Sequence, residues 1–235
     1  MTDKLNKKEK LSVNYFKKTD TLKLVGGGLL IAGLICLWIG WGWIGFILAI
    51  IGSPTGFVLF LIGASGRATD ADMDATINSK MAGLYLDIES ERKYKLRILS
   101  QHKTVTIEGY RYGEGIMIKK LKDASLRTSL FCRSQLRILS DSLYIISRDI
   151  SLINDLVEDN AYEIFYNDIE AIEIERHEER VVFNNKTFFT KPCYLHIVSN
   201  GLEIRLPISD SVTSDNLVDT INRQIKTFNN SISSQ

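Results

Sequence analysis

This 235-residue sequence has a long stretch without charge, because residues 24–66 contain no Asp, Glu, Lys or Arg. The hydrocarbon core of a bilayer takes roughly 20 helical residues, so the uncharged stretch has the length of two spans. Its middle reads WIGWGWIG, in which Trp38, Trp41 and Trp43 stand among glycines that allow the chain to reverse. The stretch predicts a transmembrane helical hairpin over residues 22–66, with the three tryptophans at one membrane interface.

Two other interpretations of this stretch meet difficulties. A cleaved signal peptide followed by one anchor needs a small-residue cleavage site, and the sequence offers no convincing one. Two buried helices of a soluble protein would require an uncharged core that is large for the chain. The first 23 residues hold seven lysines and the turn holds none, which predicts a two-pass protein of the cell (inner) membrane with both termini in the cytoplasm. Residues 1–21 then form a basic cytosolic tail, either resting on anionic headgroups or solvated.

Small residues recur every four positions in both predicted helices. They are Gly28, Ala32, Cys36 and Gly40 in the first helix and Gly45, Ala49 and Ser53 in the second, with Gly52 and Gly56 as a further pair. Small residues at this spacing allow membrane helices to approach closely. The stripes predict that the two helices pack on each other, and oligomerisation through a remaining face is the alternative.

Residues that commonly carry chemistry are also scarce, since there are only 3 cysteines and 3 histidines. The isolated cysteines do not suggest a disulfide framework, which agrees with the expected location of the domain in a reducing cytoplasm. Cys193 and His196 have the spacing of a metal-binding pair, but no second pair accompanies them and zinc takes three or four ligands. On a strand this spacing also points the two side chains to opposite faces. We therefore expect no metal, no cofactor and no enzymatic activity.

The charges that are present are segregated, although the net charge is only +1. Residues 103–148 carry 9 basic and 4 acidic side chains, whereas residues 149–180 carry 2 basic and 11 acidic ones. The candidate binding residues are the basic ones of the early strands, namely Lys119, Lys120, Lys122, Arg127, Arg133 and Arg137. We predict that they contact lipid headgroups, anionic ones included, or a protein partner, and an ordinary solvated strand edge is the alternative. Nucleic acid is not expected, because the acidic stretch would repel phosphates.

Helix signals stand at both ends of the remaining chain. Thr69, followed three residues later by Asp72, is a helix cap, and it predicts a linker helix over residues 70–99 within a linker region of 67–102. The C-terminal run SDNLVDTINRQIKTF predicts a helix with one apolar face. The residues of that face are Leu217, Val218, Ile221, Ile225 and Phe228.

Between these helices, short alternating runs predict about seven strands. Ser140-Asp141 marks one turn, and Asn200-Gly201 between two alternating runs marks a tight hairpin. About seven strands followed by one helix predict a mostly β, α+β domain over residues 103–235. We expect a small, strongly bent antiparallel barrel with the helix at its end.

Two segments of this domain carry a resemblance to a known family. The run DSLYIISRDISLI resembles a strand pair of bacterial pleckstrin-homology-like and GRAM-like domains, with Leu143, Tyr144 and Arg148 at matching positions. The run IFYNDIEAIEI is similar to the segment that follows it in the family, with Asp168 and Ile169 matching. The resemblance rests on patterned strands and not on catalytic residues.

The resemblance covers roughly residues 103–228, and the whole layout resembles bacterial membrane proteins that join a helical hairpin to such a domain. It implies binding and not catalysis. The expected function is a membrane-anchored binding or scaffolding protein whose cytosolic domain engages lipid headgroups or a protein partner. The alternative is an oligomeric membrane effector, pore-forming or triggered by a signal, in which the same domain is the sensor.

Overall fold

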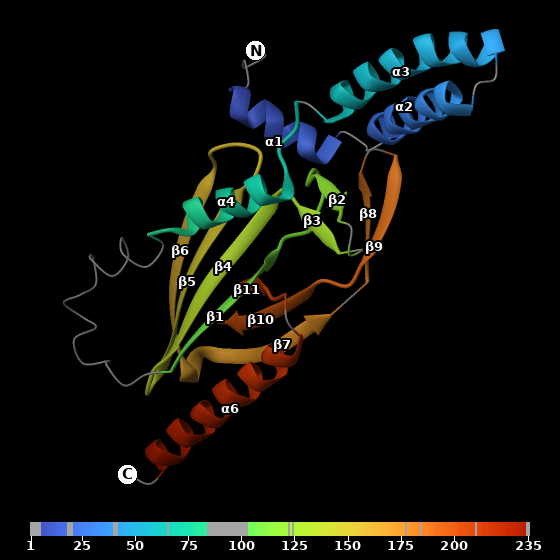
Figure 1. The fold of residues 1–235 in the computed structure, drawn as a ribbon. Helices are drawn as coiled ribbons and strands as arrows, with labels where there is room; N and C mark the ends of the chain where they lie inside the picture. The colour runs from blue at the N-terminus through green and yellow to red at the C-terminus, as the bar shows by residue number, and fades with distance from the viewer. Residues whose placement is uncertain are drawn as a thin grey trace. The chain divides into compact units, whose positions relative to one another are not determined.

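The computed structural model describes residues 6–17, 21–39, 42–64, 66–83, 103–121, 123, 125–176, 178–183, 185–209 and 211–233. The chain divides into two compact units, Met1–Asp72 and Met73–Gln235. The first unit is helical, and the second consists mostly of antiparallel strands. Figure 1 shows both units with their elements labelled.

The first unit contains three complete helices and the beginning of a fourth. They are α1 (Lys7–Lys17), α2 (Thr21–Ile39), α3 (Gly42–Ala64) and the first turn of α4 (Asp70–Met81). α1 is tied to the start of α4 because the Tyr15 hydroxyl donates to the Asp70 carboxylate at 2.5 Å. Close by, the backbone N–H of Ala68 donates to the carbonyl of Leu11 at 3.1 Å.

The predicted cap of α4 is confirmed. The N–H of Asp72 donates to Thr69 Oγ1 at 3.2 Å, and the Asp72 carboxylate accepts the N–H of Thr69 at 2.8 Å. Each residue thus satisfies a backbone donor of the other, which is how a capping pair begins a helix. The Thr69 hydroxyl also donates to the Asp72 carboxylate, at 2.8 Å, and the hydrogen bonds from the N–H and the hydroxyl of Thr69 lower the pKa of Asp72. α4 ends at Met81, and the remainder of the predicted linker helix, residues 84–99, lies outside the described residues.

α2 and α3 pack on each other as an antiparallel pair, with glycines at their contact. A Cβ placed on Gly26 would lie 2.3 Å from a backbone atom of α3, and one placed on Gly56 would lie 2.5 Å from a backbone atom of α2. A Cβ on Gly33 would lie 2.3 Å from Ser53 Oγ. The predicted packing of the two helices is therefore confirmed at Ser53 and Gly56. Gly28 of the predicted α2 stripe faces open space, so that glycine does not lie at the contact.

The membrane prediction for this helix pair is corrected. A span needs about 20 predominantly apolar residues, and no helix in the described ranges has both the length and the apolar content to cross a membrane. Lys23 lies within α2, and Ser53 and Pro54 lie within α3, so neither helix is apolar from end to end. On this finding the predicted transmembrane hairpin over residues 22–66 and the two-pass inner-membrane location are wrong. The interface role predicted for the tryptophans depended on that span.

Of the three tryptophans, the structure describes the side chains of two. Trp38 near the end of α2 and Trp43 near the start of α3 are both highly exposed, with 92% and 83% of their surface accessible. Trp41 lies outside the described residues.

The second unit contains the rest of α4, eleven described strands and a C-terminal helix. The early strands are β1 (Lys103–Tyr110), β2 (Ile118–Lys120), β3 (Leu126–Thr128), β4 (Leu130–Ile138) and β5 (Ser142–Ser151). The later ones are β6 (Val157–Phe165), β7 (Ile169–Arg176), β8 (Glu179–Phe183), β9 (Lys186–Thr190), β10 (Cys193–Ser199) and β11 (Leu202–Pro207). The final helix is α6 (Ser211–Ser233).

The strands form two larger sheets and two small hairpins. The four-stranded sheet has the order β1-β4-β5-β6, and the three-stranded sheet has the order β11-β10-β7. β2–β3 and β8–β9 are separate antiparallel hairpins. Both predicted turns are confirmed: Ser140 and Asp141 join β4 to β5, while Asn200 and Gly201 join β10 to β11 with φ angles of 48° and 76°. Two successive left-handed residues make a tight hairpin turn.

The predicted bent antiparallel barrel of about seven strands is wrong, because the eleven described strands are divided among four sheets. Between β6 and β7 the chain makes a 3-10 turn, Tyr166–Asp168, and these two strands do not pair. β1 approaches β11 without a continuous ladder: Ser209 N–H donates to the Glu108 carbonyl at 2.8 Å, and Pro207 lies against Gly109. The two larger sheets therefore share one core without closing into a barrel (Figure 1).

The core of the second unit lies between the two larger sheets and α6. It includes Leu136, Ile145, Leu195 and Ile197, whose side chains are fully buried. The predicted apolar face of α6 is confirmed, as its members are buried in this core or pack against it. They are Leu217 and Ile221, which are buried, and Val218, Ile225 and Phe228, which are partly buried.

Within the second unit, α4 is held by a second set of contacts. Met73, Ile77 and Met81 are buried along one of its faces. The Lys80 ammonium donates to the Ser151 carbonyl at 2.8 Å, and other residues of β3 and β5 bind the helix from the sheet side. The outer face of β5 is consequently buried as well as its inner face.

Candidate ligand-binding site

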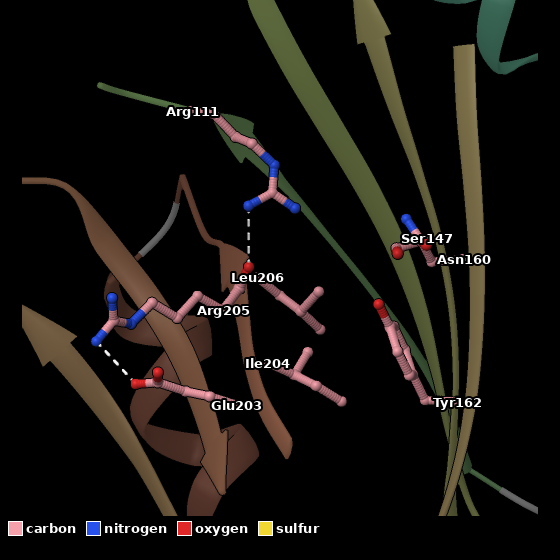
Figure 2. Close-up of a pocket in the computed structure, with 8 residues that line it drawn as sticks. All are labelled: Arg111, Ser147, Asn160, Tyr162, Glu203, Ile204, Arg205 and Leu206. Carbon is pink, nitrogen blue, oxygen red and sulfur yellow. Dashed lines mark hydrogen bonds and ion pairs between the residues drawn. The ribbon is translucent and has the colours of Figure 1, made fainter. Parts of the chain in front are cut away.

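A cavity of about 340 Å³ opens in the second unit, with residues of β5 and β6 on one side and of β11 on the other (Figure 2). Its lining residues are Arg111, Ser147, Asn160, Tyr162, Glu203, Ile204, Arg205 and Leu206. Ligand sites in proteins start at about 300 Å³. The cavity therefore has room for a small molecule or for one side chain of a partner.

The polar lining arises from a change of residue type along the strands. Alternate residues of β5 turn inward, in the order Leu143, Ile145 and Ser147. The first two belong to the core beside α6, whereas Ser147 stands opposite Asn160 of β6. Tyr162 stands opposite Ile145, with its ring against the core and its hydroxyl directed toward the cavity (Figure 2). The inner face of the sheet is thus apolar at one end and polar at the other.

Arg111 follows β1 directly and is one of the two arginines that line the cavity. Its Nε and Nη2 donate to the two carboxylate oxygens of Asp149, the second at 2.9 Å. Its Nη1 donates to the backbone carbonyl of Arg205 at 3.1 Å (Figure 2). Burial disfavours the charged guanidinium, but the hydrogen bonds and charge of Asp149 outweigh that effect and raise the pKa of Arg111. The charge of Arg111 is therefore balanced within the protein.

A buried thiol lies beside this ion pair. Cys132 Sγ is 3.7 Å from Arg111 Nη2 and 3.5 Å from Ser134 Oγ. Burial, together with the neighbouring charge of Asp149, raises the pKa of the Cys132 thiol to about 12. The nucleophile of cysteine chemistry is the thiolate. Cys132 is protonated at neutral pH and acts here as a packing residue.

Three uncharged polar side chains reach the cavity from β5 and β6. They belong to Ser147, which is only 2% exposed, and to Asn160 and Tyr162, which are half-buried. In the part of the chain that the structure describes, none of these side chains makes a hydrogen bond to another residue. Buried polar groups cost free energy when they lack a partner. Their donors and acceptors are thus available to whatever occupies the cavity.

The opposite wall of the cavity is formed by the outer edge of β11. This strand pairs with β10 on one side only, and on its other side the carbonyl of Arg205 accepts from Arg111. Because backbone groups alternate in direction along an antiparallel strand, the N–H and C=O of Glu203 face the same way as that carbonyl. The Glu203 side chain is itself engaged, accepting from Arg205 Nη2 at 2.9 Å and lying 2.8 Å from His196 Nε2. The wall therefore offers backbone groups and paired charges.

Of the six basic residues predicted as the binding set, the five that the structure describes are not among the residues that line this cavity. Lys119 and Lys120 lie on β2, Arg127 on β3, Arg133 and Arg137 on β4, and Lys122 lies outside the described residues. Arg127 is buried with its Nη2 2.7 Å from the Asp74 carboxylate of α4, and Arg133 Nε is 2.6 Å from the Glu108 carboxylate of β1. Arg137 donates to a neighbouring glutamine at 3.3 Å. These three arginines and Lys119 are thus engaged within the protein, and the role of the set in binding stays a prediction.

The predicted separation of Cys193 and His196 is confirmed. Cys193 packs against the core, whereas His196 lies on the outer face of the three-stranded sheet, 3.5 Å from the Glu173 carboxylate. Among the described residues, no group of three or more His, Cys, Asp or Glu side chains is placed to hold a metal ion. The expectations of no metal, no cofactor and no catalysis stay predictions.

Sequence reasoning missed this site because its recognition groups are uncharged. One signal was available: after Leu143 and Ile145, the next inward position of β5 is Ser147, which breaks the apolar alternation. A polar residue at an inward position either bonds within the protein or faces a site. The pairing of Ser147 with Asn160 depends on the register between β5 and β6, which the sequence does not display.

No protein-family model, curated protein or solved structure matches this chain. The resemblance of residues 103–228 to pleckstrin-homology-like and GRAM-like domains accordingly stays a prediction from sequence pattern. The function of the second unit has to be argued from the cavity.

Proposed function

We propose that the second unit is a binding module, not an enzyme, and that the cavity between its sheets receives a segment of a protein partner. The observation that carries this proposal is the set of Ser147, Asn160 and Tyr162, which point into the cavity without hydrogen-bond partners among the described residues. Polar groups placed together at the wall of a pocket fix the orientation of a ligand.

The chemistry of the lining favours binding over catalysis. A serine nucleophile needs a base within hydrogen-bond reach, and no described residue makes such a bond to Ser147. The carboxylate of Glu203 is occupied by Arg205 and His196. Cys132 is a protonated thiol whose pKa is raised to about 12 by burial.

The charges of the lining favour a protein segment over a lipid headgroup. Phosphate recognition relies on cations that are free to form charge-assisted hydrogen bonds. Arg111 is held by Asp149, and Arg205 is held by Glu203 and Glu175. The outer edge of β11, in contrast, presents backbone groups of the kind that an extended peptide pairs with.

A site-specific crosslink tests this proposal in the full chain. A photo-reactive amino acid replaces Leu202, which is exposed and precedes the cavity residue Glu203 on β11. We expect a discrete covalent adduct with a partner in cells. Asn160→Leu and Tyr162→Phe should each reduce that adduct, because they remove cavity hydrogen bonds and leave the exposed surface unchanged.

A matched position provides the control for this experiment. Phe189 on β9 is exposed and does not line the cavity. The same photo-reactive residue there should give no adduct that depends on Asn160 or Tyr162. An adduct at position 202 that survives both cavity variants unchanged, or the absence of any adduct there, would overturn the proposal.

A further inference from the structure

The charged side chains around the cavity are engaged with one another, which limits the charge of a suitable ligand: Asp149 holds Arg111, and two carboxylates, those of Glu175 and Glu203, hold Arg205. Arg111 makes two hydrogen bonds to Asp149. Arg205 lies 3.1 Å from the Glu175 carboxylate and 2.9 Å from that of Glu203. A charged ligand group would leave water for a half-buried site without an unpaired counter-charge, which is costly. The cavity is therefore suited to an uncharged group.

The groups that can meet such a ligand supply both donors and acceptors. The hydroxyls of Ser147 and Tyr162 can each donate and accept, and the Asn160 amide donates from Nδ2 and accepts at Oδ1. In that amide the donor and the acceptor stand side by side in one plane. A second carboxamide complements this edge with two hydrogen bonds, as Asn and Gln complement the edge of adenine. A single hydroxyl can complement only one of the two positions.

The rest of the lining fits the aliphatic part of such a side chain. Ile204 and Leu206 are buried and border the cavity, and the ring of Tyr162 packs against the same core. We infer that the cavity recognises the carboxamide of a Gln or Asn side chain, carried by an extended segment of the partner along β11. The inference rests on the proposed function and adds the identity of the recognised group.

Three small probes that differ in charge test the inference on the full chain. Propionamide and propionate have the same size and a planar head group and differ in charge, propylammonium is a slightly smaller cation, and small probes of this kind bind in the millimolar range. The side-chain NH₂ resonances of Asn160 in the ¹⁵N-labelled protein, assigned by their loss in Asn160→Asp, report occupancy. We expect saturable shifts with propionamide and at least about tenfold weaker binding of the two charged probes, which corresponds to about 1.4 kcal/mol.

Variants of the lining make the test specific. Asn160→Asp keeps the shape but loses the donor and adds a charge, so propionamide should bind at least about tenfold more weakly, as followed by backbone amide shifts of β5. Tyr162→Phe should weaken binding about threefold to tenfold. The control is Ser134→Ala, because Ser134 stands opposite Ser147 on the same inner face but is not among the lining residues. It should leave the affinity unchanged.

The possible results separate the inference from the proposed function. Equal or tighter binding of propionate or propylammonium would overturn carboxamide recognition. In these cases the cavity still takes a ligand, and the binding module stands. If no probe shifts the Asn160 resonances, carboxamide recognition is overturned and the crosslink at position 202 decides the proposed function separately.

Discussion

Arg148 connects β5 to two neighbouring elements, and its replacement tests how the second unit is held together. Its side chain is 9% exposed, and its Nε and Nη2 each lie 2.6 Å from a carboxylate oxygen of Asp159 on β6. Its Nη1 donates to the carbonyl of Lys80 near the end of α4 at 3.0 Å. The carbonyl of Lys80 is one of the last four in α4, and these carbonyls have no N–H partner within the helix. Arg148 therefore fastens α4 to the sheet.

Arg148→Met keeps the aliphatic length of the side chain and removes these three hydrogen bonds. Removing one partner of a buried ion pair costs about 3–5 kcal/mol. The Asp159 side chain is 36% exposed and regains water, which reduces the expected loss of stability to about 2–3 kcal/mol. The matched control is Arg205→Met, because Arg205 is also paired but 51% exposed. Exposed pairs contribute about 0–1 kcal/mol.

Urea unfolding of the full chain measures both variants. All 3 tryptophans lie in the first unit, so their fluorescence follows that unit, while the β-sheet signal in circular dichroism follows the second. We expect Arg148→Met to lower the midpoint of the β-sheet transition and Arg205→Met to change it little. Equal effects of the two variants, or a loss below about 1 kcal/mol for Arg148→Met, would refute the reasoning.

Three further predictions concern packing and protonation. Gly56→Leu should destabilise the α2–α3 pair, whereas Gly28→Leu should not, because of these two glycines only Gly56 lies against the backbone of the other helix. Tryptophan fluorescence during urea unfolding compares the two variants, and equal losses of stability would contradict the packing. Ile221→Ala, at a fully buried position, should cost about 2–5 kcal/mol in the β-sheet transition, and a loss below about 1 kcal/mol would exclude its place in the core. At pH 8 Cys132 should react with iodoacetamide at least about tenfold more slowly than Cys193. Folding raises the pKa of Cys132 from 9.0 to about 12. The contribution of the protonated thiol to stability is therefore complete below pH 9 and is lost as pH rises toward 12. Cys132→Ala should reduce this alkaline loss of stability, as measured by urea unfolding.

Local signals in the sequence predicted local structure well. The Thr69–Asp72 pair begins α4, the Asn200-Gly201 turn joins β10 to β11, and the apolar face of α6 enters the core. Each of these features depends on residues within a few positions of one another. Their physical causes, a side-chain cap, left-handed backbone and a helical period, are visible in a short window.

Features that depend on which strands pair cannot be predicted from a short window of sequence. Alternation predicts a strand but not its neighbour, so the division into separate sheets and the failure of β6 to pair with β7 could not be foreseen. Charge alone predicts the basic residues as a binding set, yet Arg127 and Arg133 are bound by Asp74 and Glu108, which are distant in sequence. The uncharged run of residues 24–66 predicted a membrane hairpin from length alone, and the described helices do not bear that out.

The most direct test of the proposed site is a crystal structure of the full chain grown with propionamide. We expect the carboxamide to lie within hydrogen-bond distance of Ser147 Oγ, the Asn160 amide and the Tyr162 hydroxyl, with Arg111 still bound to Asp149. Retention of that ion pair would show that the ligand meets only uncharged groups. A cavity that holds water alone, or a probe for which Arg111 leaves Asp149, would contradict the account.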